Sequence, residues 1–184
     1  YTRDLTDIFE IQDEISSAIL ASLRVHLLGE SAQGNLVHTS NIEAYDAYLI
    51  GRERMSNQTK DDIAAAKGKF EEAIALDPDF ALAHAQLVLA ALEMERFTES
   101  EVEHNGLIAI TDAAIKDNLA VANRLAPNHY EIAAIEGHYS AERYSYDAAA
   151  LLLDKAISLN PSFAQAYLWR AEVSYNKNQF SEML

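Results

Sequence analysis

Histidine and acidic side chains are the groups in this chain that could hold a metal ion or transfer a proton, but their spacing suits neither role. The sequence contains 6 histidines and no cysteine. No two histidines form a His-x-x-x-His pair or another spacing typical of a zinc site. Glu101, Glu103 and His104 are close in sequence, and we interpret them as a solvated acidic face. We therefore expect no metal site; the histidines are His26, His38, His84, His104, His129 and His138.

Motifs for nucleotide binding and covalent catalysis are also missing from the sequence. There is no P-loop and no Gly-x-Gly-x-x-Gly segment, and no motif frames a serine as a nucleophile. The lack of cysteine excludes disulfides and thiolate chemistry. We therefore predict that these 184 residues are not an enzyme and bind no cofactor.

The charge of the chain restricts its partners. Lys+Arg 14 against Asp+Glu 29 gives a formal net charge of −15. This charge argues against binding to nucleic acid and disfavours anionic lipid surfaces, because both require a basic footprint. The longest apolar runs, residues 87–92 and 148–153, are too short to span a bilayer. We expect a soluble domain that is not inserted in a membrane, and the sequence leaves open a cytoplasmic or periplasmic position and a membrane-anchored parent.

The elements that position these side chains follow from a repeated pattern. In three segments a large apolar residue is followed by alanine three positions on, leucine six on and proline eight on. Two of these prolines, Pro127 and Pro161, are 34 residues apart, whereas Pro78 and Pro127 are 49 apart. A period of about 34 residues with helical patterning indicates an array of helix-turn-helix repeats. The segments begin at Phe70, Leu119 and Leu153.

The pattern divides the chain into an N-terminal segment and four units. Residues 7–28 carry an apolar stripe every four residues and are predicted to form an amphipathic helix. A capping box at Ser40 is expected to start a helix from Ile42 to Met55, and a turn is expected at 176–178. The second unit has 15 extra residues, which we place around 98–113 and expect to lengthen its helices. The predicted boundaries are 1–38 for the N-terminal helix and linker, 39–80, 81–129 and 130–163 for three units, and 164–184 for a truncated fourth.

These units resemble the tetratricopeptide repeat (TPR). The family places a small residue in the first helix of each unit, alanine and a bulky residue in the second, and proline after it. The second unit departs from the pattern, with Val88 and Ile115 where small residues are usual. The resemblance implies an all-α, right-handed TPR-type solenoid with an extra N-terminal helix. The matching residues are Gly51, Ala66, Phe70, Ala73, Pro78, Gly137, Ala149, Leu153, Ala156, Pro161, Tyr167 and Ala171.

The first 15 residues carry a narrower resemblance. The segment Asp7-Ile-Phe-Glu-Ile-Gln-Asp-Glu-Ile15, together with Tyr48-Leu-Ile-Gly51-Arg52, is similar to bacterial signalling proteins in which a TolB-like domain runs into TPRs. In those proteins the upstream part is a class III adenylate cyclase or a winged-helix DNA-binding domain. The resemblance implies that any catalytic or DNA-binding part lies outside these residues.

In TPR arrays the first helices of the units line a concave groove. Several of the residues that project inward here have a plain structural interpretation as well. Tyr45, Leu49, Leu89 and Ile135 could be inter-helix core, and Arg52 could be a solvated charge or an ion pair. Exposure of Trp169 and Tyr175 could reflect only the truncated array. The predicted partner-binding residues are Tyr48, Arg52, Gln86, Leu89, Glu93, His138, Glu142, Trp169, Glu172 and Tyr175.

The nature of the partner can be narrowed by one known TPR mode. Chaperone-binding TPRs hold a C-terminal carboxylate with Lys, Arg and Asn in the groove. The matching positions here include Gln86 and Glu131, and the acidic group of Glu131 would repel a carboxylate. A protein or peptide segment with apolar and basic residues would suit Glu93, Glu142 and Glu172 better.

We predict a protein–protein interaction scaffold that is the binding or regulatory module of a larger bacterial signalling protein. One alternative is a structural or dimerisation module whose groove is filled from within, with the chain forming a homodimer. Another is the regulatory part of an adenylate cyclase.

Overall fold

The computed structural model describes the backbone of residues 39–97 and 101–182, and the side chains of 39–97 and 112–178. All regular structure within these ranges is helical, which confirms the all-α prediction. The predicted N-terminal amphipathic helix lies outside the described residues. The helices are α2 (Ile42–Ser56), α3 (Lys60–Leu76), α4 (Ala81–Glu95), α5 (Glu101–Leu125), α6 (Tyr130–Glu142), α7 (Tyr146–Leu159) and α8 (Ala164–Glu182).

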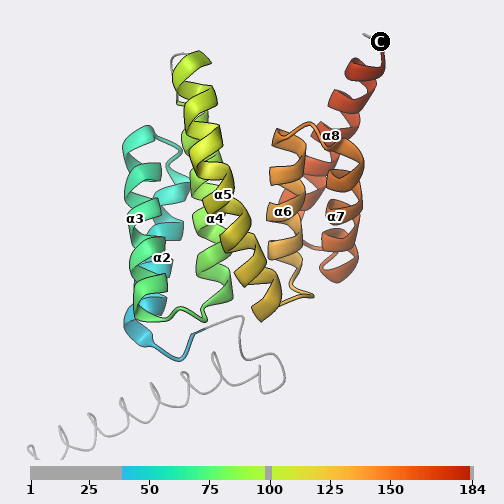
Figure 1. Cartoon of the computed structure of the whole chain (residues 1–184). Coiled ribbons are helices and arrows are strands. Elements are labelled where there is room, and N and C mark those ends of the chain that lie inside the picture. Colours follow the sequence, from blue (N-terminus) through green and yellow to red (C-terminus); the bar gives the residue numbers. More distant parts are fainter. Residues whose placement is uncertain (1–38, 98–100, 183–184) are drawn as a thin grey trace, which may run out of the picture. The chain divides into compact units, whose positions relative to one another are not determined.

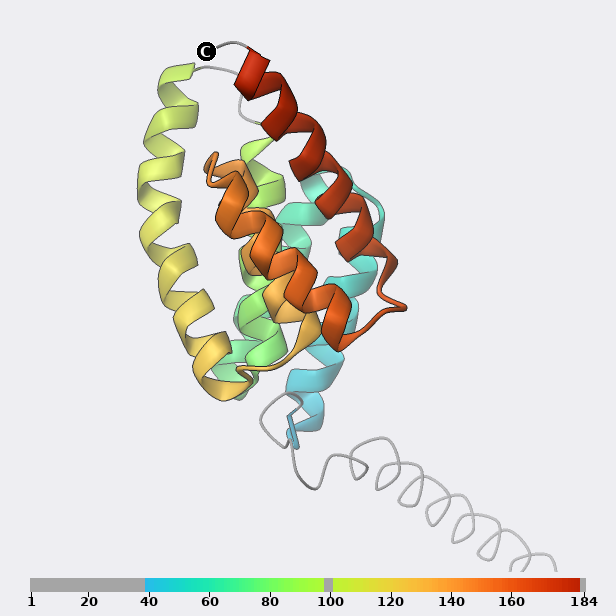
Figure 2. The ribbon, with the colours of Figure 1, turned by 90° about the vertical axis from the view of Figure 1, so that its right-hand side faces the viewer.

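The helices form antiparallel pairs stacked side by side. α2 packs on α3, α4 on α5, and α6 on α7, and α8 follows on α7 (Figure 1). The first helices of the pairs, α2, α4, α6 and α8, run in the same direction and contact one another in that order. Figure 2 views the stack from the end formed by α7 and α8, with α5 and α8 on opposite sides. None of the helices in the described ranges is long and apolar enough to cross a membrane.

The ends of the helices follow from local sequence. α3, α5 and α7 each end at the leucine of the repeated pattern, two residues before its proline, because proline disfavours helical geometry in the residue before it. Thr59 caps α3 by accepting a hydrogen bond from the Asp62 amide at 3.2 Å. The cap of α2 differs from the prediction at Ser40. The Oδ1 atom of Asn41 accepts the Ala44 amide at 3.1 Å, and asparagine is as good an N-cap as serine.

Two glycines let the helices of a pair approach closely. A Cβ atom on Gly51 would lie 2.5 Å from Cε1 of Phe70, and one on Gly137 would lie 2.8 Å from Cγ of Leu153. Both large side chains are fully buried. The repeat pattern predicts this pairing of a small residue with a large one, and the close approach compensates for the cost of glycine in a helix, about 1 kcal/mol.

The helices α5 and α8 are long, and only the length of α8 departs from the prediction. α5 begins at Glu101 and continues through the Asn105–Gly106 pair, so the extra residues of the second unit lengthen a helix. The predicted turn at 176–178 is wrong, because α8 continues to Glu182. The segment contains neither glycine nor proline, and asparagine costs less than about 1 kcal/mol in a helix.

Candidate functional site

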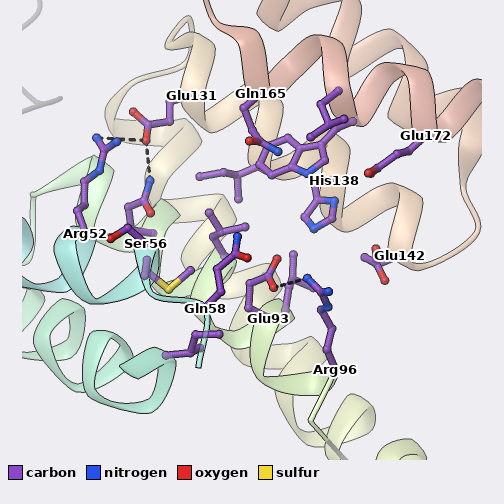
Figure 3. A pocket seen from close by; sticks show the side chains of 18 of the residues that line it. Arg52, Ser56, Gln58, Glu93, Arg96, Glu131, His138, Glu142, Gln165 and Glu172 are labelled. Atoms are coloured by element: carbon purple, nitrogen blue, oxygen red, sulfur yellow. Dashed lines mark hydrogen bonds and ion pairs between the residues drawn. The ribbon is translucent and has the colours of Figure 1, made fainter. Parts of the chain in front are cut away.

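A pocket of about 620 Å³ opens between the first helices of the pairs. We call its polar end the sealed end (Arg52, Gln86 and Glu131), its apolar middle the floor (Leu89, Ile135, Leu168 and Trp169), and its other end the acidic rim (Glu93, Glu142 and Glu172). His138 also lines the pocket (Figure 3). The other lining residues are Met55, Ser56, Gln58, Ile63, Leu92, Arg96, Phe163 and Gln165.

The pocket brings together eight of the ten residues that the sequence places in a groove. Tyr48 does not line it: the side chain is buried, and its ring centroid lies 4.9 Å from that of Phe80. Tyr175 is 66% exposed and also lies outside the pocket. Tyr175 comes six positions after Trp169, which stacks on His138, whereas α6 ends only four positions after His138. Tyr175 therefore lies beyond the level at which α6 ends. The eight are Arg52, Gln86, Leu89, Glu93, His138, Glu142, Trp169 and Glu172.

The sealed end joins three helices through one buried carboxylate. Nε2 of Gln86 on α4 donates a hydrogen bond of 2.6 Å to Oε1 of Glu131 on α6. Nη1 of Arg52 on α2 lies 3.6 Å from the same oxygen and donates to the Tyr48 hydroxyl at 3.2 Å. Burial raises the pKa of Glu131, and Arg52 and Gln86 oppose this shift. Arg52 therefore forms the ion pair that the sequence left open.

An aromatic pair forms the contact between α6 and α8 at the floor. The rings of His138 and Trp169 stack with centroids 4.5 Å apart and planes inclined by 6°. Burial, and to a lesser degree the positive charge of Arg96, lower the pKa of His138 to about 4. His138 is therefore neutral at pH 7, and the indole of Trp169 covers one face of its ring.

The acidic rim holds more negative than positive charge. Arg96 pairs with Glu93 at 2.8 Å, but its side chain is 72% exposed. Within the described part of the chain, neither Glu142 nor Glu172 has an ion-pair partner. Partial burial raises the pKa of Glu142, and the charges of Glu93, Glu95 and Glu172 raise it further, while Arg143 lowers it. The rim is thus a place where carboxylates repel one another.

An ion network behind the rim fixes the spacing of three helices. The guanidinium of Arg143 donates two hydrogen bonds to the Glu95 carboxylate, at 2.8 and 3.1 Å, and one from Nε to Asp112 at 2.8 Å. Asp112 also accepts a hydrogen bond from the Tyr139 hydroxyl at 3.2 Å. This network engages Arg143, the cation nearest in sequence to Glu142, and ties it to α4 and α5.

Sequence reasoning did not assign several lining residues to the groove. The sequence places Ile135 on the inward face of its helix, with core packing as the alternative, and it gives Glu131 only as a position of the absent carboxylate clamp. It does not assign Arg96, Gln165 or Leu168 to the groove. Leu168 is next to Trp169 in the sequence, is 55% exposed and lines the pocket. The spacing of Glu93 and Arg96, three residues apart on a helix, could have indicated their pairing.

Among the residues that the structure describes, no group of three or more His, Cys, Asp or Glu side chains is placed to hold a metal ion. The side chains of Glu101, Glu103 and His104 lie outside the described ones. The pocket offers an apolar surface, hydrogen-bonding groups and negative charge, which together suit recognition of another molecule.

Comparison with known proteins supports the same fold. No protein-family model matches the chain. The sequence is 32% identical over 143 residues to "Putative adenylate cyclase 3" of Rhizobium meliloti (strain 1021), which covers 76% of this chain and 22% of that relative. Among solved structures, the chain is similar to the first TPR domain of Spaghetti (RPAP3) bound to an HSP90 peptide, with a TM-score of 0.54 and 13% identity. That match covers 77% of this chain and 98% of the other. The part of the chain that the structure describes is therefore a TPR-type helical solenoid.

Proposed function

We propose that this domain is a protein-binding module that takes a segment of a partner protein into the pocket between α2, α4, α6 and α8. The observation that carries the proposal is the pocket itself: about 620 Å³, open to solvent, with an apolar floor and polar ends. Leu168 contributes to this floor and is 55% exposed, although it is a large apolar residue. Ile135 and Trp169 are almost fully buried and Leu89 is partly buried, so Leu168 supplies most of the exposed apolar area of the floor. An apolar side chain exposed in a pocket with polar ends suits recognition of another molecule.

The structural neighbour suggests the kind of ligand but not its charge. The Spaghetti domain binds an HSP90 peptide, and a peptide or protein segment is the corresponding ligand here. The sealed end of this pocket, however, carries the carboxylate of Glu131, already satisfied by Gln86 and Arg52. A terminal carboxylate placed there would meet like charge in a poorly solvated site. We therefore propose an apolar and basic segment as the ligand.

We further propose that the module regulates a longer signalling protein. The support is the match to a protein named as an adenylate cyclase, of which this chain spans 22%. In this view the segment bound in the pocket belongs to a regulator, and the chain described here carries out no chemistry itself. The alternative is a structural module that dimerises, for which the molar mass of the protein by light scattering is the direct measurement.

Peptide selection with matched variants tests the binding proposal. Peptides are selected from a displayed random library on the wild-type domain, and their affinities are measured by fluorescence anisotropy. Leu168→Ser places a polar group in the floor, whereas Leu151→Ser makes the same change at a residue that is 73% exposed and outside the pocket. We expect the first variant to lose most of the affinity and the second to retain it. Equal affinities for both variants would contradict the proposal.

A further inference from the structure

On three successive first helices, an acidic lining residue follows an apolar or aromatic one by one turn. Leu89 precedes Glu93 on α4, His138 precedes Glu142 on α6, and Trp169 precedes Glu172 on α8, all lining the pocket. Residues three or four apart share a helix face, and one turn rises about 5.4 Å. Because the three helices run in the same direction, all three carboxylates lie on the same side of the apolar floor.

The two ends of the pocket therefore differ in how far their carboxylates are already paired with positive charge. At the sealed end, Glu131 has both Gln86 and Arg52 as partners. At the acidic rim, three carboxylates face one exposed cation, Arg96, and Figure 3 shows the three side chains grouped around His138. A positive charge brought to the rim relieves repulsion there, whereas one brought to the sealed end competes with an existing pair.

The helix ends add to this preference. α4 ends at Glu95 and α6 at Glu142, so the carbonyl ends of both helices lie beside the rim. The C-terminal end of a helix carries about half a negative charge and favours cations. Arg143 offsets part of the negative charge of Glu142, but its hydrogen bonds go to the carboxylates of Glu95 and Asp112.

We propose that the pocket recognises a two-part motif in the partner segment. A large apolar side chain of the segment contacts the floor. An arginine or lysine side chain, displaced by about one helical turn toward the C-terminal ends of α4 and α6, binds to Glu93, Glu142 and Glu172. The proposal rests on the protein-binding function proposed above and adds its ligand chemistry and direction. The spacing of about 5 to 7 Å corresponds to one helical turn or to two residues of an extended strand. Arginine suits the rim well, because its planar fork donates to more than one carboxylate.

Charge-neutral variants of the rim test this motif. The double variant Glu142→Gln/Glu172→Gln removes two rim charges and keeps similar side-chain shapes. The matched control, Glu71→Gln/Glu72→Gln, removes two charges from α3, where both side chains are about half exposed and outside the pocket. The probes are the library-selected peptides whose binding depends on Leu168.

We expect these peptides to carry Arg or Lys close to a large apolar residue. We also expect their Kd to rise about tenfold in the rim variant, which corresponds to about 1.4 kcal/mol, and to change little in the control. Higher salt should weaken binding to the wild type more than to the rim variant. Peptides that depend on Leu168 but carry no basic residue, or bind the rim variant unchanged, would overturn this inference and leave the binding function standing. If no selected peptide depends on Leu168, the proposed function fails, and the motif fails with it.

Discussion

Replacing Gly51 with alanine should destabilise the protein, although alanine is the better helix former. The added Cβ would lie 2.5 Å from Cε1 of Phe70 and 2.9 Å from both Cδ1 and Cζ, where contact between carbon atoms is most favourable at about 3.5–4.0 Å. Phe70 is fully buried, with the Tyr48 ring at 6.1 Å, so its rigid ring has little room to withdraw. Overpacking of this kind costs about 1–3 kcal/mol.

The same change at Gly68 separates packing from helix propensity. Gly68 lies in α3, and a Cβ atom there would meet nothing within 4 Å. Gly68→Ala should therefore gain the full propensity term, about 1 kcal/mol. At Gly51 the same gain offsets only part of a cost in the upper half of the overpacking range, which leaves a net loss of about 1–2 kcal/mol.

Thermal and urea unfolding followed by circular dichroism measure both changes. For a protein of this length, 1 kcal/mol shifts Tm by about 2–4 °C, so Gly51→Ala should lower Tm by about 2–8 °C and Gly68→Ala should raise it by about 2–4 °C. If both variants raised Tm equally, Gly51 would not be a point of close helix approach, and the packing account of the repeat would be refuted.

Three further predictions concern the residues around the pocket. Arg143→Ala should lower the free energy of unfolding by about 3 kcal/mol, because it removes a partner from the buried Glu95. Arg170→Ala breaks an exposed pair with Asp154 and should lower it by less than about 1 kcal/mol. Urea denaturation of both variants checks this contrast, and equal costs would contradict it. The pKa of His138 is about 4 in the fold and about 6.5 when unfolded, so the unfolded state binds the proton first as pH falls. The free energy of unfolding should then decrease from pH 6.5 to pH 4 by an amount on the order of 2 to 3 kcal/mol. His138→Gln should reduce this dependence of stability on pH. An unchanged pH dependence in the variant would show that the pKa of His138 is not lowered in the fold. Because burial and neighbouring carboxylates raise the pKa of Glu142, peptide affinity should weaken as acid protonates it, and the loss should be absent from the Glu142→Gln/Glu172→Gln variant; anisotropy titrations across the acidic pH range check this.

The fold could be predicted from the sequence because its determinants are local and repeated. The spacing from Phe70 to Pro78 fixes where α3 ends, and the recurrence of that spacing identifies the repeat. Gly51 could be assigned to a close helix approach for the same reason. The continuation of α8 through 176–178 could not be predicted, because asparagine and lysine are compatible with a helix but do not strongly favour or end one.

The candidate site could be predicted only where one helix face decides the direction of a side chain. Leu89, Glu93 and His138 follow from the inward face of their helices. Tyr48 faces the junction with α3 and α4, and its burial depends on Phe70 and Phe80, which come from other elements. Tyr175 does not line the pocket, because α6 ends at a lower level than the turn of α8 that carries Tyr175. Helical periodicity alone does not predict this relation between the two helices.

The emission of the single tryptophan, Trp169, tests the central claim most directly. This residue lies in the floor of the pocket, stacked on His138, and the sequence contains no other tryptophan. A tryptophan-free peptide that binds in the pocket should change the intensity and wavelength of this emission, with the same midpoint as the anisotropy of the labelled peptide. Saturation seen by anisotropy with no change in Trp169 emission would place the binding elsewhere and contradict the account.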